Sequence, residues 1–105
     1  MLDLQEMAQY VPGSEFNPGD TTDEDVLSFP VAGGIAVELQ PDGTAWWRRW
    51  DATGGLSVEE EAGRVSLKLD AEDAASVFRF VCGVAVQERL GWAEEGAAGE
   101  DTGAG

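Results

Sequence analysis

The chain has 105 residues, of which 43% are hydrophobic, and its 21 acidic and 6 basic side chains give a net charge of −15. This length suits one domain with a small core. The charge disfavours nucleic acid and anionic membranes as partners and favours basic proteins. A GC-rich or salt-adapted genome would produce the same acidity, and the charge would then not indicate a partner.

The composition also limits the chemistry that the chain can perform. It contains no His, which removes the commonest general base and the usual zinc and iron ligands. Cys82 is the single cysteine, so no internal disulfide or thiol cluster forms. No apolar run approaches the roughly 20 residues of a membrane span, and the N-terminus lacks a signal-peptide pattern. We expect a cytoplasmic, non-enzymatic protein with no cofactor or metal.

The first predicted element is a short helix over residues 2–11. Leu4, Met7 and Val11 share one helical face, Asp3 suits the N-cap, and Pro12 with Gly13 stops the helix. The helix is too short to be stable alone, so it must dock on the rest of the fold.

Residues 12–25 read as a long acidic loop with a short turn that starts at Thr22. The acids lack the spacing of a calcium-binding EF-hand loop, so we expect no metal site there. They instead form part of the predicted partner-binding surface, which takes in Asp20, Asp23, Glu24 and Asp25.

Two strands and a tight turn follow. Residues 26–31 predict a strand that Pro30 confines to an edge or an end. Residues 35–40 alternate, with Ile35, Val37 and Leu39 on one face. The residues after them read Pro-Asp-Gly, which predicts a three-residue hairpin loop with a bulge at Gly43.

This loop sets the register of the segment Thr44 to Asp51, TAWWRRWD, which holds three of the four Trp. Trp47 then faces inward opposite Val37, and the side chains of Trp46, Arg48 and Trp50 form an outward stripe beside Glu38. A two-residue Asp-Gly turn would shift the register by one and exchange the two faces. Either the helix 2–11 covers this stripe, or the stripe is open to another protein.

The next apolar pattern predicts a second hairpin. Residues 56–61 and 64–69 alternate around Ala62 and Gly63, and a two-residue loop there would place Glu61 opposite Arg64. The acidic run Glu59, Glu60 and Glu61 is then mostly explained by strand pairing.

Residues 70–91 read as the principal helix, with Asp70 as N-cap and Gly91 as the stop. Residues 77–86 also alternate passably as a strand. Apolar side chains extend nearly all round the helix, so it is either covered on both sides or used as a homodimer contact. Cys82 lies on its apolar face and is expected to be a small core residue. Residues 93–105 lack large apolar side chains and predict a disordered acidic tail after a globular domain of residues 1–92.

The elements together predict an α+β fold, a mostly antiparallel meander of about five strands with a short N-terminal helix and a C-terminal helix on the sheet. Three functions fit: an acidic inhibitor of phage or mobile-element type that mimics nucleic acid and blocks a basic site on a host protein; an immunity protein or antitoxin against a basic toxin; or an oligomeric accessory protein whose acidity is only genomic. The expected partner-binding residues are Trp46, Arg48, Trp50, Glu38, Asp20, Asp23, Glu24 and Asp25.

Overall fold

The computed structural model describes the backbone of residues 1–32 and 34–102 and the side chains of residues 1–31 and 34–87. The fold is α+β, and its five strands form one antiparallel meander in the order β1-β2-β3-β4-β5. The strands are β1 (Glu15–Asn17), β2 (Val26–Ala32), β3 (Ile35–Leu39), β4 (Thr44–Trp50) and β5 (Leu56–Arg64). The helical segments are α1 (Leu4–Met7), η1 (Ala8–Tyr10), η2 (Thr22–Glu24) and α2 (Ala71–Thr102).

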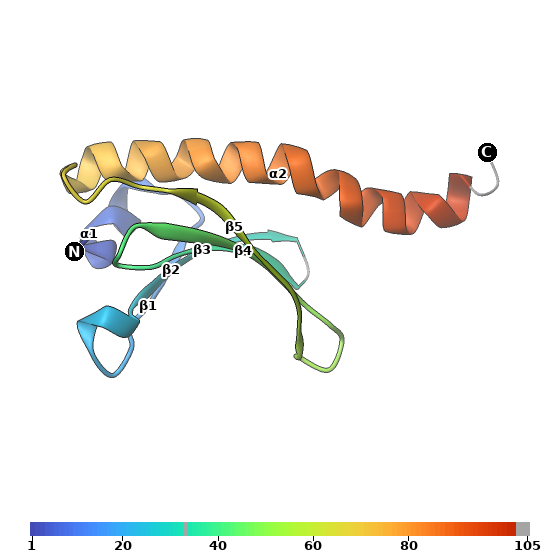
Figure 1. Cartoon of the computed structure of the whole chain (residues 1–105), viewed down its shortest axis with the longest axis horizontal. Helices are drawn as coiled ribbons and strands as arrows, with labels where there is room; N and C mark the ends of the chain where they lie inside the picture. Colours follow the sequence, from blue (N-terminus) through green and yellow to red (C-terminus); the bar gives the residue numbers. More distant parts are fainter. Residues whose placement is uncertain (33, 103–105) are drawn as a thin grey trace.

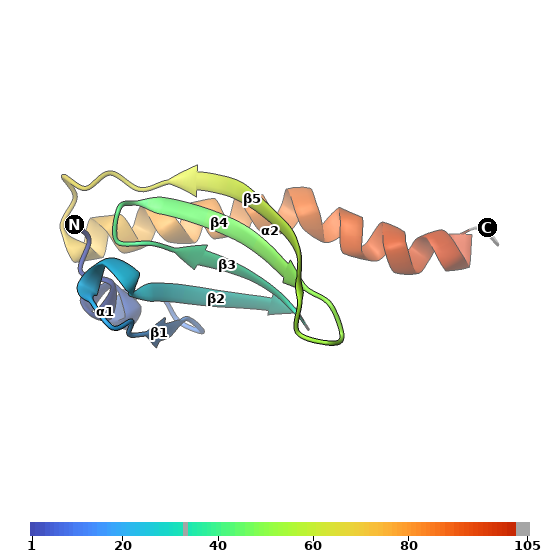
Figure 2. The same cartoon turned by 60° about the horizontal axis from the view of Figure 1, so that its bottom comes forward.

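Both α1 and α2 lie on the same face of the sheet, which we call the inner face (Figures 1 and 2). Neighbouring strands are about 4.8 Å apart, so a five-stranded sheet is about 19 Å wide, whereas one helix covers about 10 Å. A single helix therefore leaves part of the inner face bare, and α1 fills that space beside α2. Neither α1 nor α2 lies on the opposite side of the sheet, the outer face, and the short helical turn η2 projects at one end of it.

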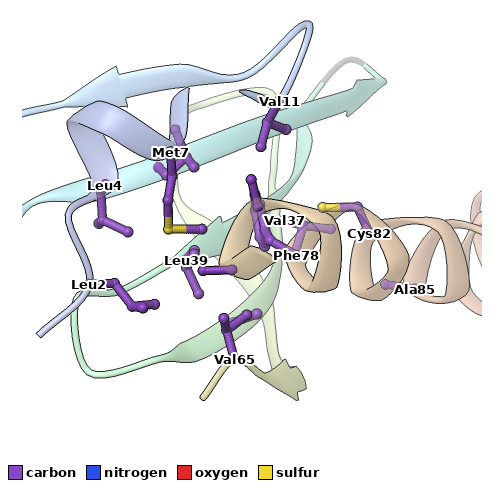
Figure 3. Packing of buried hydrophobic residues seen from close by; sticks show 14 of the residues in the cluster. Leu2, Leu4, Met7, Val11, Val37, Leu39, Val65, Phe78, Cys82 and Ala85 are labelled. Atoms are coloured by element: carbon purple, nitrogen blue, oxygen red, sulfur yellow. The ribbon is translucent and has the colours of Figure 1, made fainter. Parts of the chain in front are cut away.

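The core lies between the two helices and the inner face (Figure 3). Phe78 of α2 is fully buried, and the sheet contributes the inward side chains that the strand pattern predicts. The buried side chains include Leu4, Met7, Val11, Leu27, Ile35, Val37, Leu39, Trp47, Phe78 and Cys82. The short first helix is held at its N-terminal end, since Asp3 accepts from the Glu6 amide and the Leu2 amide donates to the Pro41 carbonyl.

The three-residue turn between β3 and β4 is confirmed. Gly43 has a φ of +91°, and Glu38 pairs with Trp46 and Val37 with Trp47. The Asp42 carboxylate accepts from the Thr44 amide at 2.9 Å. The register is therefore the one in which Trp47 is buried and Trp46, Arg48 and Trp50 face outward, and the alternative register is excluded.

The predicted second hairpin is wrong. Residues 56–64 form one strand that pairs with β4 along its length, through two bulges. Gly63 does not turn the chain: it lies beneath α2, where an added Cβ would come within 3.0 Å of Val81 Cγ1. The glycine signal thus reflects the close approach of a helix to the sheet. Leu67, in the second strand of the predicted hairpin, instead lies half exposed in the connection to α2.

Two further expectations need correction. The predicted loop 12–25 contains the short edge strand β1, which pairs with the start of β2. The principal helix is confirmed over the alternative strand, but it continues to Thr102 instead of stopping at Gly91, and it runs past the sheet in Figure 1. Residues 93–102, for which we expected disorder, have a helical backbone. Residues 103–105 of the predicted tail lie outside the described residues. The division into a domain and a tail stays a prediction.

Candidate functional site on the outer face of the sheet

The outer face is built by alternate residues of all five strands. One row crosses the sheet through Glu15, Ser28, Glu38, Trp46 and Glu61, as the strand registers require. Because α1 packs with α2 on the inner face, neither helix covers this row. Of the two alternatives left open by the sequence, the one in which the N-terminal helix covers the Trp stripe is therefore wrong, and the three side chains are partly exposed.

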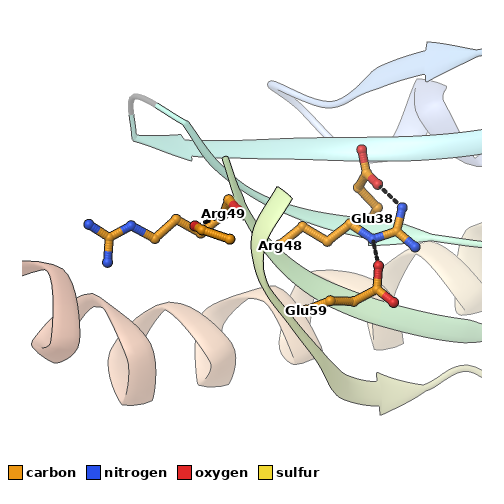
Figure 4. Close-up of polar contacts among 5 residues, drawn as sticks. Glu38, Arg48, Arg49 and Glu59 are labelled. Carbon is orange, nitrogen blue, oxygen red and sulfur yellow. Dashed lines mark hydrogen bonds and ion pairs between the residues drawn. The ribbon is translucent and has the colours of Figure 1, made fainter. Parts of the chain in front are cut away.

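Arg48 lies at the centre of this face, between two carboxylates (Figure 4). Its Nη1 donates to Glu38 Oε1 at 2.5 Å, and its Nε lies 3.0 Å from Glu59 Oε2. The side chain of Glu38 is 15% exposed and that of Arg48 is 21% exposed, so water screens this pair less than a free surface pair. The neighbouring Arg49 points away from this cluster, because alternate residues of a strand face opposite sides.

The contact between Arg48 and Glu59 is an ion pair rather than a hydrogen bond. Although the two atoms are close, the direction of the buried Nε–H does not meet the geometry of a hydrogen bond. Arg48 also lies over Trp46, with its guanidinium carbon 6.0 Å from the ring centroid. The arginine is therefore held from three directions by Glu38, Glu59 and Trp46.

Trp46 carries a buried donor that has no acceptor among the described residues, its indole Nε1. A buried donor without a partner costs about 1–3 kcal/mol. The apolar and cation–π contacts of the ring therefore stabilise this position, and the unpaired indole Nε1 opposes them.

The far end of the stripe is apolar. Trp50 pairs with Leu56 across β4 and β5, and Leu56 is 50% exposed. The sequence interpretation missed Leu56, Glu59 and Glu61 as members of this surface, because it paired residues 56–61 with residues 64–69. The sequence showed that these side chains alternate between two faces, but it did not show that their partner strand is β4.

The acidic loop residues lie apart from the stripe. Asp20, Asp23 and Glu24 are exposed on the connection between β1 and β2, and Asp25 Oδ1 accepts from the Gly19 amide. Asp23 lines a shallow hollow with Pro41 and Asp42, at the end of the sheet where β3 turns into β4. In Figure 1, η2 and the loop after β4 both project on the side away from α2, so they bound the outer face at its two ends.

The second projecting loop is ordered by Asp51. Its Oδ1 accepts from the Thr53 hydroxyl at 2.6 Å and from the amides of Thr53 and Gly55. These hydrogen bonds, the Thr53 hydroxyl first, hold the pKa of the Asp51 carboxyl below its usual value. The carboxylate therefore acts as the cap of this turn.

Cys82 is buried on the inner side of α2, and burial raises the pKa of its thiol to about 12. In the part of the chain that the structure describes, no three Cys, Asp or Glu side chains gather as a metal ion needs. None of the helices among the same residues is long and apolar enough to cross a bilayer.

No protein-family model, curated protein or solved structure matches this chain significantly. What the outer face binds must therefore be inferred from its own side chains.

Proposed function

We propose that this chain is a small, acidic, non-enzymatic cytoplasmic protein that binds and blocks a basic surface of another protein. The observation that carries the proposal is the placement of both helices on the inner face, which leaves Trp46, Arg48 and Trp50 uncovered. Trp and Arg are the residues most enriched among those that dominate binding energy at protein interfaces.

The charge around the stripe supports a basic partner. Glu15, Glu38, Glu59 and Glu61 share the outer face, and a single cation, Arg48, lies among them on β4. Its charge is already opposed by two of these carboxylates. Arg64, at the end of β5, is likewise 3.1 Å from Glu61. The surface offered to a partner is therefore acidic with apolar centres.

The rest of the domain adds to the same field. Before residue 44 the chain holds nine acids and no base. Seven of those acids are exposed: Asp3, Glu6, Glu15, Asp20, Asp23, Glu24 and Asp42. Such a field attracts a basic surface over a distance of about 8–10 Å at ordinary ionic strength. A protein site that normally binds nucleic acid has the required charge, and carboxylates here would replace its phosphates.

The experiment is capture of a partner from host lysate by the immobilised chain, at about 50 and about 200 mM salt. We expect a basic protein to bind at the lower salt, to be lost at the higher, and to be released by added duplex DNA. The variant with Trp46→Ala and Trp50→Ala should capture much less, whereas Leu67→Ala is a control that removes an exposed apolar side chain off the outer face. The proposal is contradicted if the amount of captured protein is the same at both salt concentrations, with added DNA and with the Trp variant.

A further inference from the structure

A second exposed apolar surface lies on α2, on the side away from the sheet. Phe80 is 72% exposed and Val84 is 37% exposed, and side chains four residues apart share a helix face. Phe80 is the most exposed large hydrophobic side chain among the described residues. The outer-face stripe does not account for it, because α2 packs on the inner face.

A groove of about 490 Å³ runs beside this pair of side chains. It lies between α2, the loop after η1 and strand β2. Its lining is largely apolar: Pro12, Phe29, Arg79, Cys82, Gly83, Val86 and Gln87. Gly83 forms its rim toward Phe80. A Cβ placed on Gly83 would meet nothing within 4 Å, so the helix surface is low and open at this point.

The charge pattern of α2 identifies a fitting occupant. Residues 74–87 contain no acid and one base, Arg79, in a chain whose net charge is −15. Two copies of so acidic a chain repel each other over most of their surfaces. This helix face is a place where they can approach without bringing carboxylates together.

We propose that two copies of this chain associate through α2, with Phe80 of each copy entering the groove of the other. Antiparallel helices around a twofold axis place Phe80 of one copy opposite Gly83 of the second, and the same operation places Ser76 opposite Gln87. Both polar side chains are exposed, so they can pair at the ends of the apolar contact. Arg79 at the groove then lies near the incoming ring, where a guanidinium favours an aromatic face.

The test is the mass of the pure full-length chain by sedimentation, from about 2 to about 500 μM, a range that detects a dimer with a micromolar dissociation constant. We expect the mass to rise from 11.1 kDa toward twice that value. Phe80→Ala removes the inserted ring, and Gly83→Leu fills the rim. Each should raise the dimer dissociation constant at least about tenfold, whereas Leu67→Ala should leave it unchanged.

Both variants are expected to keep the monomer intact, because Phe80 is exposed and Gly83 faces open space. Circular dichroism checks this, and Phe80→Ala serves alone if Gly83→Leu misfolds. A chain that stays monomeric over the whole range, or a dimer unaffected by Phe80→Ala, overturns the proposal. No partner protein is present, so the outcome is separate from that of the proposed function.

Discussion

Arg48 on β4 is paired with Glu38 on β3 across the outer face, and Glu59 on β5 lies against the same guanidinium from the other side. One cation thus links three adjacent strands on the face opposite α1 and α2. Removing it would leave the part-buried carboxylate of Glu38 and the exposed carboxylate of Glu59 without their shared cation. The pair therefore fixes the arrangement of the proposed binding surface.

Arg48→Ala should lower the free energy of unfolding by about 1–3 kcal/mol, more than Glu38→Gln, which leaves Arg48 with Glu59. Chemical denaturation at about 50 mM and about 1 M salt measures both, and added salt should reduce the Arg48→Ala loss by screening the remaining carboxylates. Equal and salt-independent losses would show that Arg48 stabilises the sheet by packing alone.

Replacing Trp46 by a smaller aromatic residue should not destabilise the fold. Trp46→Phe keeps an aromatic ring beneath Arg48 but removes the buried indole donor that has no acceptor. We expect a change between zero and about 1 kcal/mol of stabilisation, whereas Trp46→Ala should cost about 1–3 kcal/mol. Thermal unfolding distinguishes them. A large loss in the Phe variant would mean that the indole nitrogen has a partner.

Two glycines should respond oppositely to alanine. At Gly43, with φ of +91°, a Cβ would overlap the Val65 carbonyl oxygen, so Gly43→Ala should cost about 2–4 kcal/mol. At Gly83 the Cβ meets open space in a helix, so Gly83→Ala should stabilise the monomer by up to about 1 kcal/mol. Denaturant titration at low protein concentration measures both changes. The same sign at both positions would contradict the described turn or helix.

Cys82 should be unreactive in the folded chain. Its pKa of about 12, against an ordinary 9.0, reduces the thiolate fraction near neutral pH about a thousandfold. Because burial raises this pKa, its contribution to stability is complete below the unfolded pKa and is lost as pH rises through the folded value. Rates of thiol labelling with and without denaturant check this, and a native rate equal to the unfolded rate would refute it.

The strand pattern was sufficient for the first hairpin but not for the last strand. Pro41, Asp42 and Gly43 have local conformational preferences that specify one turn and therefore one register. Gly63 also suggests a turn in the sequence, but no turn forms there. The position is small because Val81 of α2 packs closely against it. A contact between residues so far apart in the chain has no local signature.

The part of the site that depends on local strand pairing was predicted, and the part that depends on distant contacts was not. Alternation and the turn placed Trp46, Arg48, Trp50 and Glu38 together, because these are effects of neighbouring strands. The apolar face of the N-terminal helix showed that Leu4, Met7 and Val11 had to be buried, but not on which side of the sheet. That choice depends on how much of the inner face α2 leaves uncovered.

The affinity of the captured partner for the wild-type chain and for the Trp46→Ala, Trp50→Ala variant tests the central claim most directly. Calorimetry at about 50 and about 200 mM salt should show at least about a hundredfold weaker binding by the variant and about tenfold weaker wild-type binding at the higher salt. The variant must first show a cooperative unfolding transition. Equal affinities for the two folded chains would show that the outer face is not the binding surface.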